Sequence, residues 1–152
     1  MLTDEIRASL DESVLCWLAT VDADGAPSCS PKEIFVHHGA SGVAIADIAS
    51  PGSARNVRAN PEVCVSFVHV LKQKGFKLKG RARYVRADDA NADGDGEALD
   101  RLRAMAGEAF PIRGMILVEV RSASRIAAPG YHLVPGTTEA SQVESARRAY
   151  GV

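Results

Sequence analysis

A short polar run between two apolar stretches has the composition of an anion-binding turn. The run Ser50-Pro51-Gly52-Ser53 follows the apolar residues 43–48, and Arg55 and Asn56 come soon after it. Serine is a preferred helix N-cap and proline suits the first helical position, so a helix is expected to begin here. The free N–H groups and the positive dipole end of such a helix favour a phosphate. Taken alone, this segment supports a phosphate site and a plain connecting helix about equally.

Three cysteines and a histidine pair are the other residues with reactive side chains. Cys16, Cys29 and Cys64 form no Cys-x-x-Cys pair, and each lies in or beside an expected strand. They are interpreted as buried free thiols in a reducing, cytoplasmic protein. His37 and His38 are adjacent at a strand edge, so their side chains should point to opposite faces. Without a third ligand nearby, no metal site is predicted.

An acidic loop at 87–97 has some of the features of a calcium-binding loop. The residues that align with calcium-loop positions are Asp89, Asn91, Asp93, Gly94 and Asp100. However, a strand precedes the loop where an EF-hand has a helix, and the last position is Asp instead of a bidentate Glu. A solvated loop is therefore the favoured interpretation.

The segment 76–85 alternates with the two-residue period of a strand. Its apolar or small residues share one face, and the other face has four cations, Lys77, Lys79, Arg81 and Arg83. Four cations on one face repel each other unless solvent or an anion lies against them. A solvated outer face is favoured for most of them, and contact of one or two with a bound phosphate or an acidic partner is the alternative.

Composition and periodicity indicate one mainly β domain over 1–152. The chain has 152 residues with 46% hydrophobic and 24% charged residues and a net charge of −1, which gives no bulk electrostatic basis for binding nucleic acid or a membrane. A helix is expected at 3–13, a second along the stripe Leu99, Leu102, Met105 and Ala109, which is interpreted as core, and a docking helix at 141–150 capped by Ser141 and Glu144. Six strands are expected, at 14–21, 26–36, 43–48, 63–70, 76–85 and 115–120.

Three runs of residues resemble a known family. They are ADGAPSCSPKEIFV, IADIASPGSARNVRANPEVCVSF and QKGFKLKGRARYV, and together they are similar to the pyridoxamine 5'-phosphate oxidase-like FMN-binding split barrels. The Asn-x-x-x-Asn-Pro element from Asn56 to Pro61, after Ser50 and Ser53, is the most distinctive part. The resemblance implies a six-stranded antiparallel split β-barrel over about 14–127. It also implies a homodimer with the cofactor at the subunit interface.

The resemblance assigns candidate cofactor-binding residues position by position. Ser50, Ser53 and Arg55 match the phosphate-binding turn, and Asn56 matches the helix residue beside it. Lys32, with its neighbour Glu33, matches a basic residue near the flavin or its phosphate. Ile34, Ala46 and Asp47 match strand positions whose backbone meets the isoalloxazine ring. Lys74 and Lys77 match polar or basic residues before Gly80 that lie near the flavin.

The resemblance implies an FMN-dependent oxidoreductase of unknown substrate, although it does not single out a catalytic residue. The C-terminal run APGYHLVPGTTEASQVESARRAYGV lacks the Arg-Leu-x-Pro ending of the vitamin-B6 oxidases, so oxidation of pyridoxamine phosphate itself is not expected. A non-catalytic flavin-binding or electron-carrier module is the alternative. Deazaflavin coenzyme or haem in place of FMN also stays open.

Overall fold

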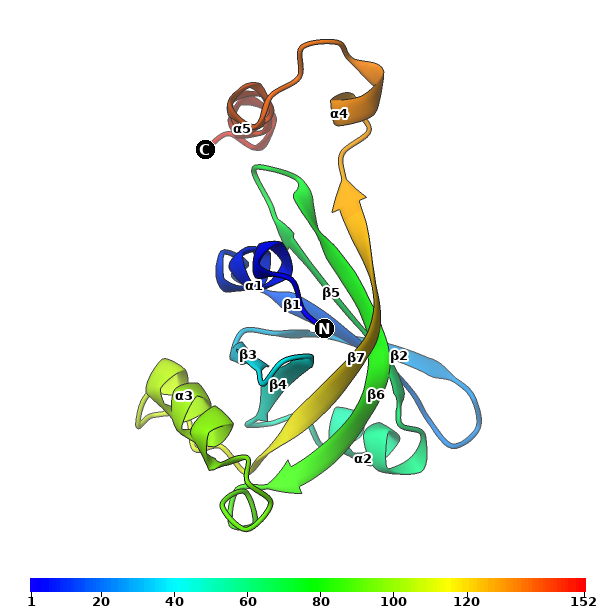
Figure 1. Ribbon diagram of the computed structural model, residues 1–152, viewed down its shortest axis with the longest axis vertical. Helices are drawn as coiled ribbons and strands as arrows, with labels where there is room; N and C mark the ends of the chain where they lie inside the picture. Colours follow the sequence, from blue (N-terminus) through cyan, green and yellow to red (C-terminus); the bar gives the residue numbers. More distant parts are fainter.

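Seven antiparallel strands form a single sheet in the computed structural model, which describes all of residues 1–152 (Figure 1). The sheet order is β2-β1-β5-β6-β7-β4-β3. The strands are β1 Cys16–Val21, β2 Pro27–Lys32, β3 Phe35–His38, β4 Gly42–Asp47, β5 Glu62–His69, β6 Lys74–Arg86 and β7 Gly114–Ala127. The expected fold class, mainly β with a split-barrel arrangement, is confirmed.

The strand expected at 26–36 is two strands, which raises the count from six to seven. β2 pairs with β1 and β3 pairs with β4, so these consecutive strands lie at opposite edges of the sheet. Only Glu33 and Ile34 join them, and the Ala46 N–H donates to the Ile34 carbonyl at 2.9 Å. The sheet therefore curls until its two edges meet at this link, which we call the seam. Periodicity within 26–36 could not show this change of partner.

The concave side of the sheet holds the larger of two hydrophobic cores. Inward residues alternate along the strands, and α1, Asp4–Asp11, adds Ile6 and Leu10 to them. Thr3 caps this helix, because its hydroxyl accepts from the Ile6 N–H at 3.3 Å. α2, Pro51–Ala59, contributes Val57 from the other end of the barrel.

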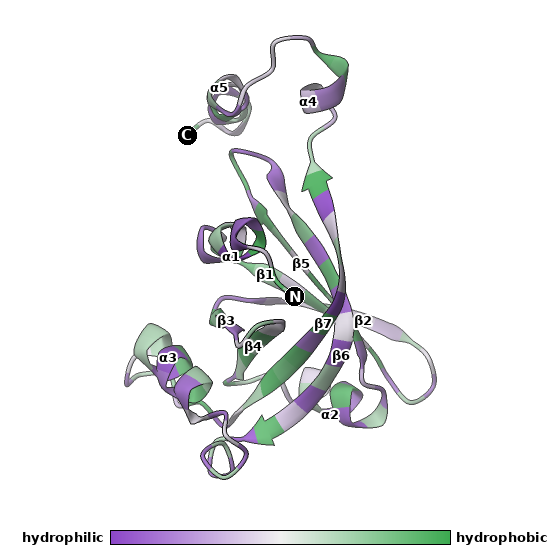
Figure 2. Cartoon of the chain, in the orientation of Figure 1, coloured by the Kyte–Doolittle hydropathy of each residue, from purple (hydrophilic) through white to green (hydrophobic).

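The convex side of β4 and β7 packs against α3, Gly96–Ala106, and forms the second core. Leu99 and Leu102 of the helix pack there with Met115 and Leu117 of β7. Figure 2 shows this part of β7 and the neighbouring β4 as hydrophobic stretches. Burial on both faces explains why these two strands have almost continuous apolar sequences.

The C-terminal arm, residues 128–152, lies beyond the end of β7 and contains α4, Gly130–Leu133, and α5, Glu139–Tyr150. The capping box expected at Ser141 and Glu144 is wrong by one turn. Thr138 is the N-cap, and its hydroxyl accepts from the Ser141 N–H at 3.1 Å. None of the five helices has the length and hydrophobicity that crossing a membrane requires.

Candidate functional site

A cavity of about 390 Å³ lies at the seam, between the joined sheet edges and the end of α3. Its volume is within the range of small-molecule sites. Five of the predicted cofactor-binding residues line it: Lys32, Glu33, Ile34, Ala46 and Ser50. Residues that are far apart in the chain meet here because the split strand brings β2 beside the end of β4. We call this space the seam cavity.

Lys32 is the buried cation of the seam cavity. Its side chain points to the concave side opposite Cys16, and the residue is only 7% exposed. The ammonium group donates to the Ser50 hydroxyl. Burial lowers the pKa of Lys32, while the negative charge of Asp47 acts in the opposite direction. The result is a positive charge held at a fixed place beside the turn that follows β4.

The N-terminus of α2 provides further donors for an anion. Ser50 is the N-cap and Pro51 the first helical residue, as expected, although the Ser50 side chain makes no capping bond. The backbone N–H groups of Gly52 and Ser53 have no hydrogen-bond partner. A Cβ at Gly52 would meet no atom within 4 Å, so the space beside this backbone is open. The Ser53 hydroxyl lies 3.2 Å from that of Ser30 on β2.

Asp47 lies behind this turn and does not line the seam cavity. Its carboxylate is buried and accepts from the Ser50 N–H through Oδ1 and from the Tyr84 hydroxyl through Oδ2, both at 2.9 Å. The Ser50 N–H is therefore not available to a ligand. Burial and the bond to Asp47 raise the pKa of Tyr84.

Two predicted residues of α2 face away from the seam cavity. Arg55 is exposed and makes no hydrogen bond or ion pair. Asn56 is buried, and its amide donates to the Thr20 hydroxyl of β1 at 3.0 Å. At this end of α2 the N-cap Ser50 lines the cavity, the predicted Ser53 does not, and Asn56 points into the core.

The predicted lysines of β6 lie elsewhere in the fold. Lys74 pairs with Glu139 of α5 at 3.0 Å and lies 4.2 Å from the centre of the Tyr131 ring. Lys77 is exposed on the convex face, in register with Ser66 and Ser124. The four alternating cations of β6 are all exposed, which agrees with the solvated face that the sequence favoured.

Three residues that the sequence analysis did not assign to a site belong to this region. Met105 was expected in the core, but it is half exposed and lines the seam cavity with Phe110 from beyond α3. The helical stripe gave no sign of this, because α3 ends at Ala106 and its last turn projects past the second core. Tyr84 lies on the strand expected at 76–85, and its bond to Asp47 joins it to the site.

The cysteines and histidines do not gather at one place. Cys16 is buried, and burial raises its pKa to about 12, whereas Cys29 is exposed because β2 is an edge strand. The expectation that Cys29 is buried is therefore wrong. His37 lies between two arginines, and His38 bonds to the buried Asp95 at 3.2 Å.

The acidic loop does not direct its carboxylates toward a common centre. Asp89, Asp93 and Asp100 each lie within 4 Å of a different arginine, at 3.9, 3.6 and 3.7 Å respectively. Asp95, which the calcium alignment left out, is the buried carboxylate of this loop and pairs with Arg83. The loop is thus held to β6 by ion pairs, whereas the Asp100–Arg103 pair lies within α3.

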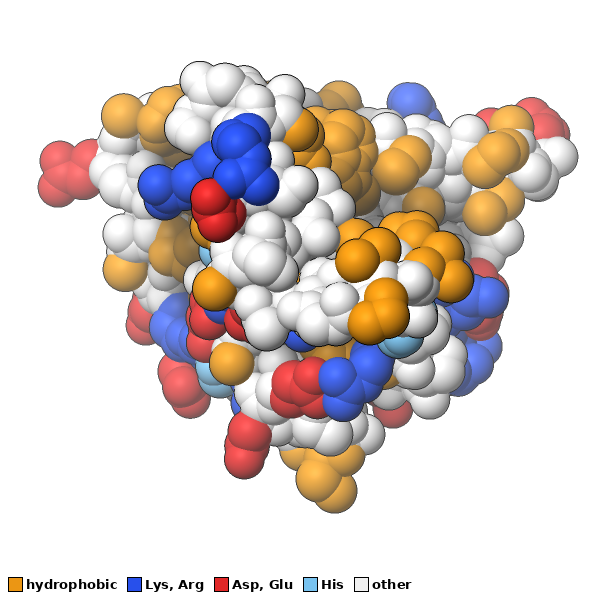
Figure 3. Space-filling model, turned by 90° about the horizontal axis from the view of Figure 1, so that it is seen from above, with side chains coloured by type: hydrophobic (Ala, Val, Ile, Leu, Met, Phe, Trp, Pro, Cys, Tyr) orange, Lys and Arg blue, Asp and Glu red, His pale blue; other side chains and the backbone are white.

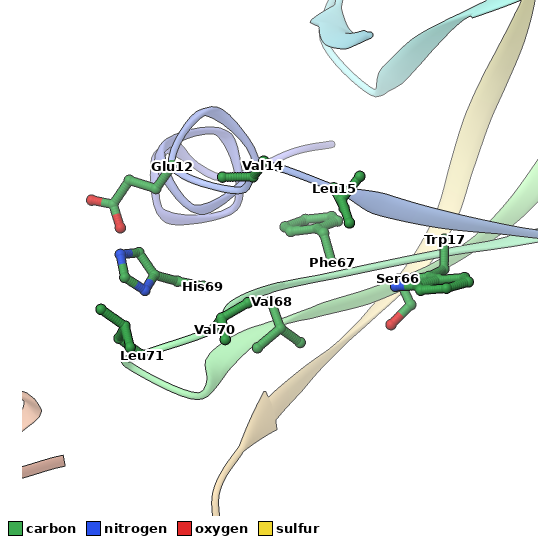
Figure 4. A pocket seen from close by; sticks show the side chains of 10 residues that line it. All are labelled: Glu12, Val14, Leu15, Trp17, Ser66, Phe67, Val68, His69, Val70 and Leu71. Carbon is green, nitrogen blue, oxygen red and sulfur yellow. The ribbon is translucent and has the colours of Figure 1, made fainter. Parts of the chain in front are cut away.

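A second cavity, of about 340 Å³, is mostly apolar and contains none of the predicted site residues. Figure 4 shows Val14 and Phe67 at the α1 side of this cavity and Trp17 with Ser66 at its far side. Trp17 is the direct cross-strand neighbour of Pro31, which lines the seam cavity. A residue of each cavity therefore lies side by side with one of the other on neighbouring strands β1 and β2.

Comparison with protein families gives a direct match. Residues 2–126 match the family model described as pyridoxamine 5'-phosphate oxidase. The chain belongs to this family. The match spans the sheet, α1, α2 and α3, and it ends before the C-terminal arm. A search of curated proteins found no match.

Solved structures with the same fold have low sequence identity to the chain. HupZ of Group A Streptococcus is 19% identical, with a TM-score of 0.66 over 84% of this chain and 99% of its own. An FMN-binding protein of Syntrophomonas wolfei is 10% identical, with a TM-score of 0.68 over 82% and 86%. A protein titled F420 reductase is 19% identical, with a TM-score of 0.58 over 81% and 98%. These similarities show the fold.

Proposed function

We propose that the protein binds FMN at the seam cavity and acts as a flavin-dependent oxidoreductase in the cytoplasm. The observation behind this proposal is the set of donors at the N-terminus of α2. The Lys32 ammonium and the Ser50 hydroxyl line the cavity and are bonded to each other. The first turn of α2 adds two unpaired N–H groups, the Ser53 hydroxyl and the open space beside Gly52. A helix N-terminus with a neighbouring cation is suited to a phosphate monoester.

The remainder of the seam cavity suits a flat ring. Ile34, Ala46 and Ile48 line one part, and Met105 and Phe110 line another. A flavin bound here would supply hydride and single-electron chemistry. The protein residues would fix the phosphate at one end and hold the ring between apolar side chains and strand backbone.

The proposed assembly is a homodimer, and the apolar convex face supports it. Val14, Trp17 and Val70 are large apolar residues that are 80%, 47% and 62% exposed. They line the second cavity, and Trp17 is the cross-strand neighbour of Pro31, which lines the seam cavity. A second copy covering this surface would lie beside the flavin.

A binding titration tests the proposal. Protein freed of ligand is titrated with FMN and with deazaflavin coenzyme, and flavin fluorescence reports the affinity of each. Binding of FMN at micromolar concentration or tighter is expected, and failure to bind either compound would end the proposal. Preference for deazaflavin coenzyme would keep the site and replace the cofactor. Reduction of the bound flavin by a nicotinamide donor separates an enzyme from a passive flavin-binding module.

Matched lysine variants locate the phosphate. We call Lys32, Ser50, Ser53 and the N–H groups of Gly52 and Ser53 the cradle. Lys32→Met should weaken FMN binding at least tenfold, because it removes the buried charge of the cradle. Lys79→Met, which removes an exposed lysine of the convex face, should leave binding unchanged. Lys77→Met tests the position that the family resemblance assigned to the flavin. Equal effects of Lys32→Met and Lys79→Met would contradict a phosphate at the α2 N-terminus.

A further inference from the structure

A hydrogen bond from the Tyr84 hydroxyl to the buried Asp47 carboxylate lies close to the seam cavity. Asp47 is only 5% exposed and its two oxygens each accept one hydrogen bond, from the Ser50 N–H and from the Tyr84 hydroxyl. No arginine or lysine nitrogen lies within 4 Å of this carboxylate. A buried carboxylate with two donors loses much of its stabilisation when one donor is removed.

The position of Tyr84 is fixed by its neighbours. A Cβ at Gly114 would lie 2.5 Å from the Tyr84 hydroxyl oxygen, so only glycine allows the ring to lie against this strand. The Arg58 guanidinium of α2 lies 4.1 Å from the centre of the ring on another side. The hydroxyl therefore points at Asp47 because the surrounding backbone and side chains leave it little other space.

Asp47 in turn acts on Ser50 and Lys32, the two residues of the cradle that line the cavity. It holds the backbone of Ser50 through the N–H, and its charge opposes the burial penalty on the Lys32 ammonium. Lys32 and the Ser50 hydroxyl are also bonded to each other. One path of direct contacts therefore runs from Tyr84 through Asp47 and Ser50 to Lys32, from the barrel wall to the cavity.

We propose that Tyr84 is a positioning residue for the phosphate end of the cofactor, acting through Asp47 on Ser50 and Lys32. The inference rests on the proposed function, because it requires a ligand phosphate at the cradle. Without the hydroxyl, Oδ2 of Asp47 has no donor, and the carboxylate is free to turn away from Ser50. That rotation releases the Ser50 backbone, so the cradle must be reordered each time a phosphate binds.

The test is a double-mutant cycle on FMN affinity in the full-length protein. Tyr84→Phe keeps the ring and removes only the hydroxyl, and it should weaken FMN binding about tenfold. In an Asp47→Ala background the same substitution should have no further effect, because Tyr84 then has no carboxylate to position. Asp47→Asn replaces Asp47→Ala if the latter does not fold.

A tyrosine far from the seam provides the control. Tyr150→Phe removes a hydroxyl that accepts from Gln73 at 2.7 Å on the arm, and it should leave FMN affinity unchanged. Wild-type affinity in Tyr84→Phe, with only a lower melting temperature, would show a purely structural role and overturn the inference. A loss of FMN affinity from Tyr84→Phe that is as large in the Asp47→Ala background as in the wild type would also overturn it. A wild-type protein that binds neither flavin nor deazaflavin would instead overturn the proposed function, and the inference with it.

Discussion

Lys32 shows what the sequence could and could not predict at the scale of single residues. The family resemblance pointed to this lysine, but nothing in the spacing of SCSPKEIF shows that its side chain is buried. Its environment depends on Cys16 across the strand pair and on Asp47, fifteen residues later in the chain. Tertiary placement therefore decides its charge environment, and local sequence patterns do not contain this information.

Phe110 allows a test of the apolar end of the seam cavity. It is 57% exposed and lines the cavity beside Met105. Phe110→Ala should lower FMN affinity about five- to tenfold, because a flat ring would lose an aromatic neighbour. The free energy of unfolding should change by less than about 0.5 kcal/mol, as for other exposed sites.

Flavin fluorescence titration and chemical denaturation check both values for Phe110→Ala. Leu133→Ala is the control, since Leu133 is an exposed apolar residue of the arm. A large loss of stability with unchanged affinity would show that Phe110 supports the fold and not the cavity.

His37 should make stability depend on pH. Arg7 Nη1 lies 3.0 Å from His37 Nδ1, and Arg101 Nη2 lies 3.4 Å from Nε2. Burial, with these two cations, lowers the pKa of His37, although Asp11 acts in the opposite direction. The unfolded chain, with a histidine pKa of about 6.5, therefore binds a proton at a higher pH than the folded protein. Stability contributed by neutral His37 is complete above pH ~6.5 and is lost as the pH falls toward the lower folded value.

Urea denaturation from pH 7.5 to 5.5 measures this effect. The free energy of unfolding of the wild type should decrease as the pH is lowered. The decrease should be less than about 1.4 kcal/mol per pH unit, which is the value for uptake of one full proton. His37→Gln should have a shallower dependence over the same range. Identical slopes in the two proteins would exclude His37 as the titrating group.

At the scale of elements, the alternation of β6 was predicted closely and the division of 26–36 was not. Phe76, Leu78 and Ala82 are buried as the period of two requires. In contrast, β2 and β3 differ only in which strand lies beside them, and that choice depends on the curvature of the whole sheet. Pro27 and Pro31 are compatible with β2 because it is an edge strand, where a missing N–H donor costs no ladder bond.

Gly80 is the most sensitive element-level position. It lies at the register shift of β6 against β7, and a Cβ there would lie 2.1 Å from the Glu119 carbonyl oxygen. Gly80→Ala should therefore destabilise the protein by about 2–4 kcal/mol, since the two longest strands would have to separate locally.

Gly52→Ala is the matched control for the effect of adding a methyl group. Its Cβ meets nothing within 4 Å, and alanine favours a helix, so stability should rise by about 0.5–1 kcal/mol. Thermal and urea unfolding of both variants provide the comparison. Equal destabilisation by the two substitutions would contradict the close strand contact at Gly80.

At the scale of the whole molecule, the C-terminal arm is an addition to the family fold. The family match ends at residue 126, and the arm begins two residues later. Figure 3, seen from the end of the molecule that carries the arm, shows hydrophobic and charged side chains mixed over this face. The arm exposes Leu133, Val134 and Val152, and of its helical residues only Ala146 is buried.

Ala146 is therefore the buried apolar contact of an arm that polar bonds also hold to residues 72–74. Ala146→Arg should release α5 from the β5–β6 hairpin and lower the free energy of unfolding by about 1–2 kcal/mol. FMN affinity should stay unchanged, because the arm contributes no residue to the seam cavity. Hydrogen exchange across 139–150 and a flavin titration measure the two effects. Ala149→Arg, an exposed position on the same helix, should change neither.

The seam gives the barrel a place where it can open without losing a strand pair. The one backbone hydrogen bond at the seam, from Ala46 to Ile34, continues the β3–β4 ladder, and β2 is joined to the α2 turn by side-chain bonds of Lys32 and Ser30. Such a weakly connected edge is expected to exchange its amide hydrogens faster than the β6–β7 ladder. A phosphate held by both β2 and α2 would then close the barrel as a non-covalent cross-link. Slower exchange at Ala46, Gly52 and Ser53 on adding FMN is the expected sign of that closure.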